Sequence, residues 1–160
     1  MRQCANDRTT RKNSFQKKII GKKEHEKWFL SILRQVDKNM AFIFCGPNRI
    51  RLGIVRFSRT RLSQKKWEIH FTISPRMRGK GFAKPMIIRG LLALNKIAPE
   101  SVLLARVKKE NERSLRVLQS LGFRPMAPKN SAHGGVRLFL RLGHFPLRAS
   151  KNRIAPNDGF

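Results

Sequence analysis

Tyrosine is absent from this 160-residue chain, and cysteine occurs only twice. Cys4 and Cys45 are too few for a disulfide framework and lack the spacing of a metal-binding pair, and Cys45 is expected to be a buried strand residue. No apolar run approaches the length of a membrane span, and the basic N-terminus lacks the apolar stretch of a signal peptide. The sequence therefore predicts a cytoplasmic protein with no metal site and no membrane contact.

Acidic residues are also scarce, since 9 Asp and Glu stand against 36 Lys and Arg, a formal charge of +27. Such a charge attracts any polyanion, so non-specific attraction to nucleic acid is expected. The basic residues are spread along the whole chain and no aromatic RNA-binding motif appears, which disfavours sequence-specific nucleic-acid recognition. The length fits one domain, and 40% hydrophobic residues are enough for a core.

Hydrophobic periodicity predicts strands and helices in a mixed order. Residues 41–46 and 50–57 are expected to form an antiparallel hairpin, and further strands are expected at 66–73, 102–107 and 136–142. Helices are expected from Lys22, after Gly81 and over 111–120, with Gly122 closing the last one. On the first helix, one face carries Trp28, Phe29, Ile32, Leu33 and Val36. This order predicts an α/β (α+β) fold with a mixed sheet and helices on both faces.

Residues 74–83, Ser-Pro-Arg-Met-Arg-Gly-Lys-Gly-Phe-Ala, join a strand to a helix through a basic turn that contains two glycines. The first amides of a helix have no intrahelical acceptor, and the helix dipole favours an anion in front of them. Gly79 and Gly81 let the backbone approach that anion, while Arg78 and Lys80 add positive charge. The turn therefore predicts a phosphate site.

Two motifs then point to one family. Arg78-x-x-Gly81-x-Ala83 resembles the acetyl-CoA signature of the GCN5-related N-acetyltransferases (GNAT), Arg/Gln-x-x-Gly-x-Gly/Ala, and the segment from Asn111 to Phe123 is similar to that family's second motif. The resemblance implies a mostly antiparallel sheet with a splayed central strand pair, and acetyl-CoA as co-substrate. It implies coenzyme contacts at Phe71, Thr72, Ile73, Arg78, Gly79, Lys80, Gly81, Phe82, Ala83, Asn111 and Ser114. The expected divisions are a basic N-terminal segment (1–20), an N-acetyltransferase domain (21–143) and a poorly ordered tail (144–160).

The N-terminal half resembles one branch of this family. Asn6-Asp7, Glu24-His25-x-x-Trp28-Phe29 and Gly53-x-Val55-Arg56-Phe57 are similar to segments of the pseudaminic-acid pathway N-acetyltransferases, which acetylate a nucleotide-linked amino sugar. The alternatives are an N-acetyltransferase for protein N-termini or ribosomal proteins and a non-catalytic polyanion-binding protein of the same fold. Family members usually carry a first strand ahead of the Asn-Asp segment, so the N-terminal segment is expected to be shortened here.

Direct acetyl transfer requires a neutral acceptor amine, a polarised acetyl carbonyl and a proton source for the departing thiolate. The resemblance implies that a backbone amide near Ile73 polarises the carbonyl. Glu68 and His70, both expected on the strand face opposite Ile69 and Phe71, are the candidate catalytic bases; the alternative is that both simply face solvent.

Two residues are candidates for acceptor binding. Arg56 is a candidate ligand for a phosphate of the acceptor, and Trp28 for the wall of its cleft; the alternatives are a solvated arginine and a core aromatic. His25 and His133 are expected to be structural or surface residues. The family often places a proton-donating tyrosine where this chain has Leu118, so proton delivery must have another source.

Overall fold

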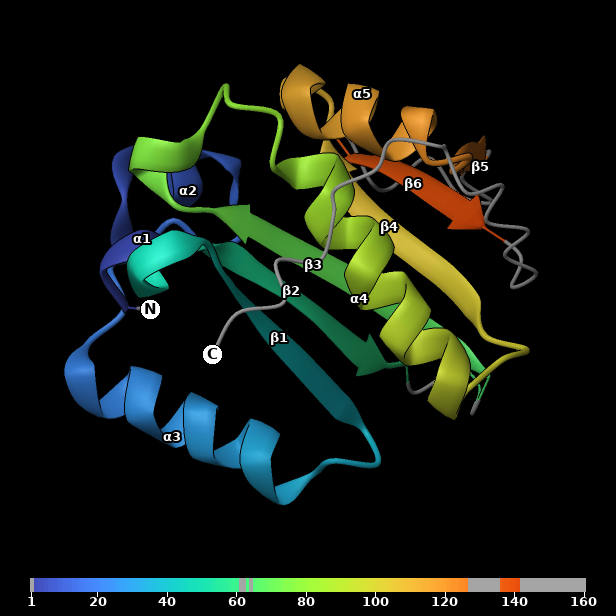
Figure 1. Ribbon diagram of the computed structural model, residues 1–160, viewed down its shortest axis with the longest axis horizontal. Coiled ribbons are helices and arrows are strands. Elements are labelled where there is room, and N and C mark those ends of the chain that lie inside the picture. Colours follow the sequence, from blue (N-terminus) through green and yellow to red (C-terminus); the bar gives the residue numbers. More distant parts are fainter. Residues whose placement is uncertain (1, 61–62, 64, 127–135, 142–160) are drawn as a thin grey trace.

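The computed structural model describes residues 2–60, 63, 65–126 and 136–141. Six strands form one sheet in the order β1-β2-β3-β4-β6-β5 (Figure 1). Their bounds are Asn39–Cys45 (β1), Arg51–Arg59 (β2), Lys66–Ile73 (β3), Val102–Lys108 (β4), Arg124–Met126 (β5) and Val136–Arg141 (β6). The α-helices are Arg2–Asn6 (α1), Arg8–Asn13 (α2), Lys22–Arg34 (α3), Ala83–Ile97 (α4) and Glu112–Ser120 (α5), with 3-10 turns at Pro47–Arg49 (η1) and Pro75–Met77 (η2).

The centre of the sheet opens where β3 and β4 meet. These strands are parallel and pair only at Lys66 with Val102, Trp67 with Leu103 and Glu68 with Leu104. Because β3 runs on to Ile73 and β4 to Lys108, the strands diverge beyond their first three residues. On its other side β3 pairs continuously with β2, from Trp67 to Ile73. The predicted mixed, mostly antiparallel sheet with a splayed central pair is confirmed.

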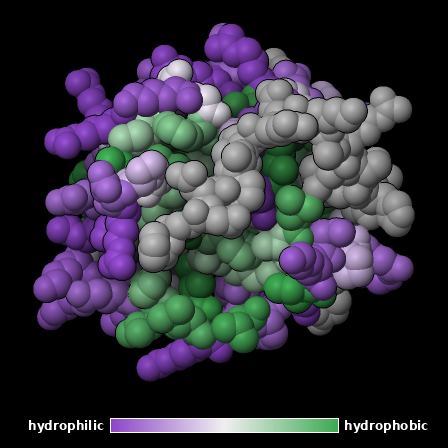
Figure 2. Space-filling model, viewed as in Figure 1, coloured by the Kyte–Doolittle hydropathy of each residue, from purple (hydrophilic) through white to green (hydrophobic). Residues whose placement is uncertain are grey.

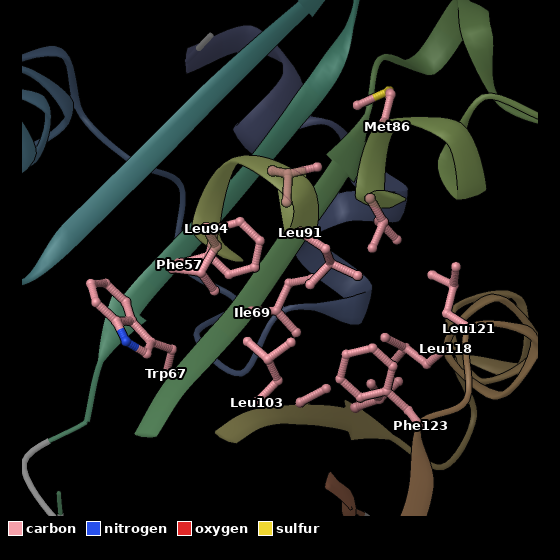
Figure 3. Packing of buried hydrophobic residues seen from close by; sticks show 14 of the residues in the cluster. Phe57, Trp67, Ile69, Met86, Leu91, Leu94, Leu103, Leu118, Leu121 and Phe123 are labelled. Atoms are coloured by element: carbon pink, nitrogen blue, oxygen red, sulfur yellow. The ribbon is translucent and has the colours of Figure 1, made fainter. Parts of the chain in front are cut away.

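One face of the sheet carries the core. Alternate residues of β2, β3 and β4 point to this face, as the period of a strand requires, and α4 and α5 cover it. Figure 3 shows Phe57, Trp67 and Ile69 of the sheet beside Leu91 of α4 and Leu118 of α5. Burying each such side chain contributes about 1.5–3 kcal/mol. The residues between them therefore face the opposite side, and these include Arg56, Glu68 and His70.

The opposite side is approached by α1, α2 and α3 (Figure 1). Cys4 of α1 donates from Sγ to Ser74 Oγ at 3.8 Å, which ties α1 to the end of β3. The sequence predicts one apolar face on α3, but only Ile32 of that helix is buried, while Phe29, Leu33 and Val36 are exposed. Figure 2 shows hydrophobic residues gathered over this helix. Much of this stripe stays exposed because α3 touches mainly β1, the last strand of the sheet.

Other local expectations have mixed outcomes. The hairpin, the strands at β3 and β4 and the helix capped by Gly122 (φ 80) are confirmed. Cys45 is exposed rather than buried, because it is the last residue of an edge strand and follows a register shift between Phe44 and Cys45. The expected last strand is present as β6, and Leu142, His133 and the tail at 144–160 lie outside the described residues. No helix in the described part of the chain is long and apolar enough to span a membrane.

Candidate active site

A cavity of about 1160 Å³ opens where β3 and β4 separate. Its walls come from α1, α2, α3, β2, the outer halves of β3 and β4, the start of α4 and one side of α5. A strand whose neighbour has diverged leaves alternate backbone N–H and C=O groups unpaired on that side. Phe71, Thr72 and Ile73 lie in this part of β3 and line the cavity. Their contact with a pantetheine arm, which the family resemblance implies, stays a prediction.

The phosphate end of the cavity is made of backbone. Gly79 (φ 76) and Gly81 (φ 80) both have left-handed conformations that favour glycine, and a Cβ at either position would meet no atom within 4 Å. Phe82 precedes the first turn of α4, whose amides have no intrahelical acceptor. Pro85 is tolerated at the third helical position because its missing N–H is one of these unbonded amides. The loop therefore presents open backbone and a helix N-terminus to an anion.

The side chain of Arg78 has a different partner from the one expected. Its Nη2 lies 2.6 Å from Asp7 Oδ2 and donates to Thr10 Oγ1 at 2.9 Å, which joins the loop to α2. The hydrogen bond from Arg78 lowers the pKa of Asp7, although partial burial opposes this effect. Lys80 is exposed and does not line the cavity. Of the two cations expected at the phosphates, one is occupied by an ion pair and the other projects elsewhere.

The second motif lies across the cavity from this loop. Asn111 caps α5, because its Oδ1 accepts from the Ser114 amide at 3.4 Å, and both residues line the cavity. Arg113 and Arg116 of the same helix line it too and place positive charge at this end. Leu118 is fully buried in the core, so no side chain at this position reaches the cavity. The helix therefore supplies polar and basic groups, while Leu118 offers no counterpart to the family's tyrosine.

At the other end, three strands present a group of charged residues. Arg56 and His70 are direct partners across β2 and β3, and both line the cavity. His70 Nε2 lies 3.7 Å from Glu68 Oε1, and Arg106 Nε of β4 lies 2.7 Å from the same oxygen. Glu68 keeps 17% of its side-chain surface exposed and His70 keeps 35%. His70 therefore lines this edge of the cavity with Glu68 beside it, and Arg56 and Arg106 flank the pair.

Burial and positive neighbours make this histidine a weak base. Desolvation and then Arg56 lower the pKa of His70 to about 4, with Glu68 opposing and Arg106 adding to the effect. Desolvation also lowers the pKa of Arg56, against the attraction of Glu68. His70 is therefore neutral near pH 7, which leaves its lone pair free to take a proton.

Aromatic rings of α3 and the N-terminal segment flank the charged group. The Arg56 guanidinium lies 5.2 Å from the Trp28 ring centroid, and Trp28 contacts His25 at 5.3 Å between ring centroids. Arg106 lies 5.4 Å from the Phe15 ring centroid, a distance at which a cation–π attraction operates. Trp28 thus lines the cavity and is not a buried core residue, and His25 also lines the cavity; binding of the acceptor by Trp28 stays a prediction.

Sequence reasoning gave no role to Arg106, Phe15, Asp7 or Gly53. Arg106 alternates with buried residues on β4, a pattern common to any solvated strand face. Gly53 belongs to a segment that resembles the family, but its spacing indicates no contact; a Cβ there would lie 2.3 Å from the Thr72 carbonyl oxygen, so only glycine allows β2 to approach this part of β3. Asp7 belongs to a segment that resembles the family, but nothing in its spacing indicates an ion pair with Arg78.

Comparison with known proteins agrees with the acetyltransferase resemblance of the two motifs. The profile of the acetyltransferase (GNAT) domain matches residues 2–124. The chain belongs to the GNAT acetyltransferase family. This GNAT protein is an acetyl-CoA-dependent N-acetyltransferase, and acetyl-CoA is its co-substrate. No curated protein sequence matches it significantly.

Solved structures share the fold at low sequence identity. The spermidine N-acetyltransferase from Vibrio cholerae in complex with CoA and spermine is 19% identical with a TM-score of 0.77, over 89% of this chain and 87% of that one. A domain from Methanocaldococcus jannaschii DSM 2661 is 21% identical with a TM-score of 0.72, over 88% of each chain. These likenesses establish the GNAT fold of the chain.

The residues present fit the coenzyme. The open glycines and the helix N-terminus suit its phosphates, and the unpaired half of β3 suits an extended amide-bearing arm. Among the described residues, no group of three or more His, Cys, Asp and Glu side chains gathers as metal ligands do. Glu68 and His70 remain the candidate proton acceptors, although Glu24 and His25 also line the cavity, and a backbone amide near Ile73 is the candidate donor to the acetyl carbonyl.

Proposed function

We propose that this N-acetyltransferase transfers the acetyl group directly to a primary amine of a nucleotide-linked amino sugar. The observation that carries the proposal is the charge of the cavity. Eight basic side chains line it and one acidic side chain does: Arg11, Arg51, Arg56, Arg78, Lys84, Arg106, Arg113 and Arg116 against Glu24. Lys84, Arg113 and Arg116 lie at the coenzyme end, and the remaining excess supports an acceptor that brings negative charge of its own.

Arg56 is the central residue of this argument. Its guanidinium has five N–H donors, and within the described residues it has a stacking contact with Trp28 but no hydrogen-bond acceptor. Partial burial makes an unpaired guanidinium unfavourable, and a phosphate supplies the bidentate acceptor that it prefers. The neighbouring indole of Trp28 offers an apolar face to a base or sugar ring. Together they form the candidate recognition site for a nucleotide-linked acceptor.

A polyamine is the acceptor suggested by the Vibrio cholerae enzyme, whose complex holds spermine. A polycation requires carboxylates, but Glu68 is already paired with Arg106 and Glu24 is exposed. The acceptor end of this cavity repels such a molecule. Protein N-termini or ribosomal proteins remain the alternative acceptors, for which the basic surface is the supporting feature.

The test compares acceptors in one assay of coenzyme A thiol release, at about 0.3 M salt to screen non-specific attraction. We expect kcat/KM for an amino sugar linked to uridine diphosphate to exceed that of the same free sugar by about 10²-fold, because each charge-assisted hydrogen bond contributes about 1.5–3 kcal/mol. Preference for spermidine or for an N-terminal peptide would contradict the proposal.

A further inference from the structure

We infer that His70 is the base that deprotonates the acceptor amine, and that a phosphate of the acceptor seated against Arg56 strengthens this base when it binds. The inference rests on the proposed function, because it requires an acceptor that carries both an amine and an anion. It adds a property of the site: a cationic side chain that recognises the acceptor also controls the catalytic group. For an amine that lacks the anion, His70 would be too weak a base to deprotonate it.

The geometry places the two residues as direct neighbours. Arg56 and His70 are cross-strand partners on the same face of β2 and β3, where Cβ atoms lie about 4.5–5.5 Å apart. Both line the cavity. An anion that contacts the guanidinium therefore also lies close to the imidazole, and its charge acts on both.

The other charged groups around His70 are already balanced or more distant. Arg106 of β4 is paired with Glu68 at 2.7 Å, so these two largely offset each other. The elements that face this end of the cavity contribute Arg11 of α2 and Glu24 and His25 of α3. Of the two cations that lower the pKa of His70, Arg56 is thus the one without a carboxylate partner in the described part of the chain. It is the second cause, after burial, of the low pKa of His70.

Proton transfer from an ammonium group is efficient when the base has a pKa near the working pH. In the free protein the pKa of His70 is about 4, too low for that role. An anion on Arg56 cancels the positive charge that disfavours imidazolium, so the pKa of His70 rises. Glu68, 3.7 Å from Nε2, then stabilises the imidazolium that forms.

The step balances as follows. The acceptor ammonium gives one proton to the His70 imidazole and becomes a neutral amine. The nitrogen lone pair forms a C–N bond to the thioester carbonyl carbon of acetyl-CoA, and the C–S bond breaks as its electron pair leaves with sulfur. The second amine proton ends on the coenzyme thiolate, and the imidazolium returns its proton to water. No oxidant or other co-reactant is needed.

The experiment is a nuclear magnetic resonance titration of the His70 imidazole in the full chain saturated with coenzyme A, with and without uridine diphosphate. His70→Gln assigns the signal. We expect uridine diphosphate to raise the pKa of His70 by about 1–3 units, the size of a nearby charge effect. Arg56→Gln should raise this pKa without any nucleotide, and uridine diphosphate should then change it little. Arg89→Gln, which removes an exposed arginine of α4 outside the cavity, should behave as the parent protein.

The outcomes separate the two proposals. Calorimetry on the same samples measures whether uridine diphosphate binds the coenzyme-loaded protein. Binding that depends on Arg56 but leaves the pKa of His70 unmoved would overturn the inference and leave the proposed acceptor standing. Absence of binding would overturn both. If Arg56→Gln folds poorly, Arg56→Lys serves instead, because it keeps the charge but loses the bidentate fork, so the low pKa should persist while the response to the nucleotide weakens.

Discussion

The two ends of the cavity are built from different groups of the chain, backbone at one end and side chains at the other. The coenzyme end is made of backbone: two glycines with positive φ, the N-terminus of α4 and the unpaired part of β3. The acceptor end is made of side chains from β2, β3, β4 and α3, namely Arg56, His70, Arg106 and Trp28. A backbone site tolerates changes in most side chains, whereas a side-chain site changes its ligand with each substitution. We therefore expect coenzyme binding to depend on the fold, and acceptor binding to depend on the side chains of this particular sequence.

The difference is clearest at Gly81, where replacement by valine should have the largest effect. A β-branched residue at φ 80 is strained, and its side chain would enter the open space before the α4 amides. We expect calorimetry to detect no coenzyme binding, a loss of about 100-fold or more in affinity for a lost helix N-terminal phosphate site. Gly21→Val is the matched control, since its backbone is extended and its surroundings are equally open. A folded Gly81→Val protein that binds normally would disprove the assigned phosphate site.

At the acceptor end, loss of the base should change turnover and not coenzyme affinity. We expect His70→Gln to lower kcat by about 10²–10⁴-fold, the usual contribution of a general base. The dissociation constant for acetyl-CoA should stay within about twofold, because the contacts of the coenzyme are with backbone at the other end. Glu100→Gln, in an exposed ion pair with Lys65, is the control for removal of a titratable group. An unchanged kcat in His70→Gln would leave Glu68 or water as the base.

The same histidine should make the stability of the fold depend on pH. Its folded pKa of about 4 lies below the ordinary value of 6.5, so the fold favours the neutral form. Below about pH 6.5 the unfolded chain gains a proton that the folded chain does not, and stability falls until the pH reaches about 4. We expect the urea midpoint to fall from pH 7 to pH 5 and to fall less in His70→Gln. Equal pH dependence in both proteins would show that His70 is not shielded as described.

Loss of the ion pair between Arg78 and Asp7, which joins the two ends of the cavity, should have the smallest effect. Arg78 and Asp7 keep 23% and 21% of their side-chain surface exposed, so we expect Arg78→Gln to change stability by about 1 kcal/mol or less. Coenzyme affinity should fall no more than about fivefold, and the KM of the acceptor should rise with it, because α2 borders both. Asp7→Asn should reproduce this pattern, which identifies the contact rather than the arginine charge as the cause. A large loss of coenzyme affinity in Arg78→Gln alone would instead indicate direct phosphate contact.

The sequence by itself determined the coenzyme half of this protein. Period-two and helical patterns placed β3, α4, β4 and α5, and Gly79 and Gly81 marked the turn between the first two, because left-handed backbone has a residue signature. The GNAT resemblance of the two motifs was sufficient to indicate acetyl-CoA. These features are local, and local geometry is encoded by residues a few positions apart.

Only the tertiary structure decided how side chains distant in sequence meet. It paired Arg78 with Asp7 and Glu68 with Arg106, and it set Arg56 beside His70. It also left Phe29 and Leu33 of α3 exposed and ended β1 at an exposed Cys45. A pattern of alternation states which residues share a face, but not what lies opposite that face. Ion pairs, desolvation and the strength of a base depend on those neighbours. The contacts at the acceptor end could therefore be described only from the register of the strands.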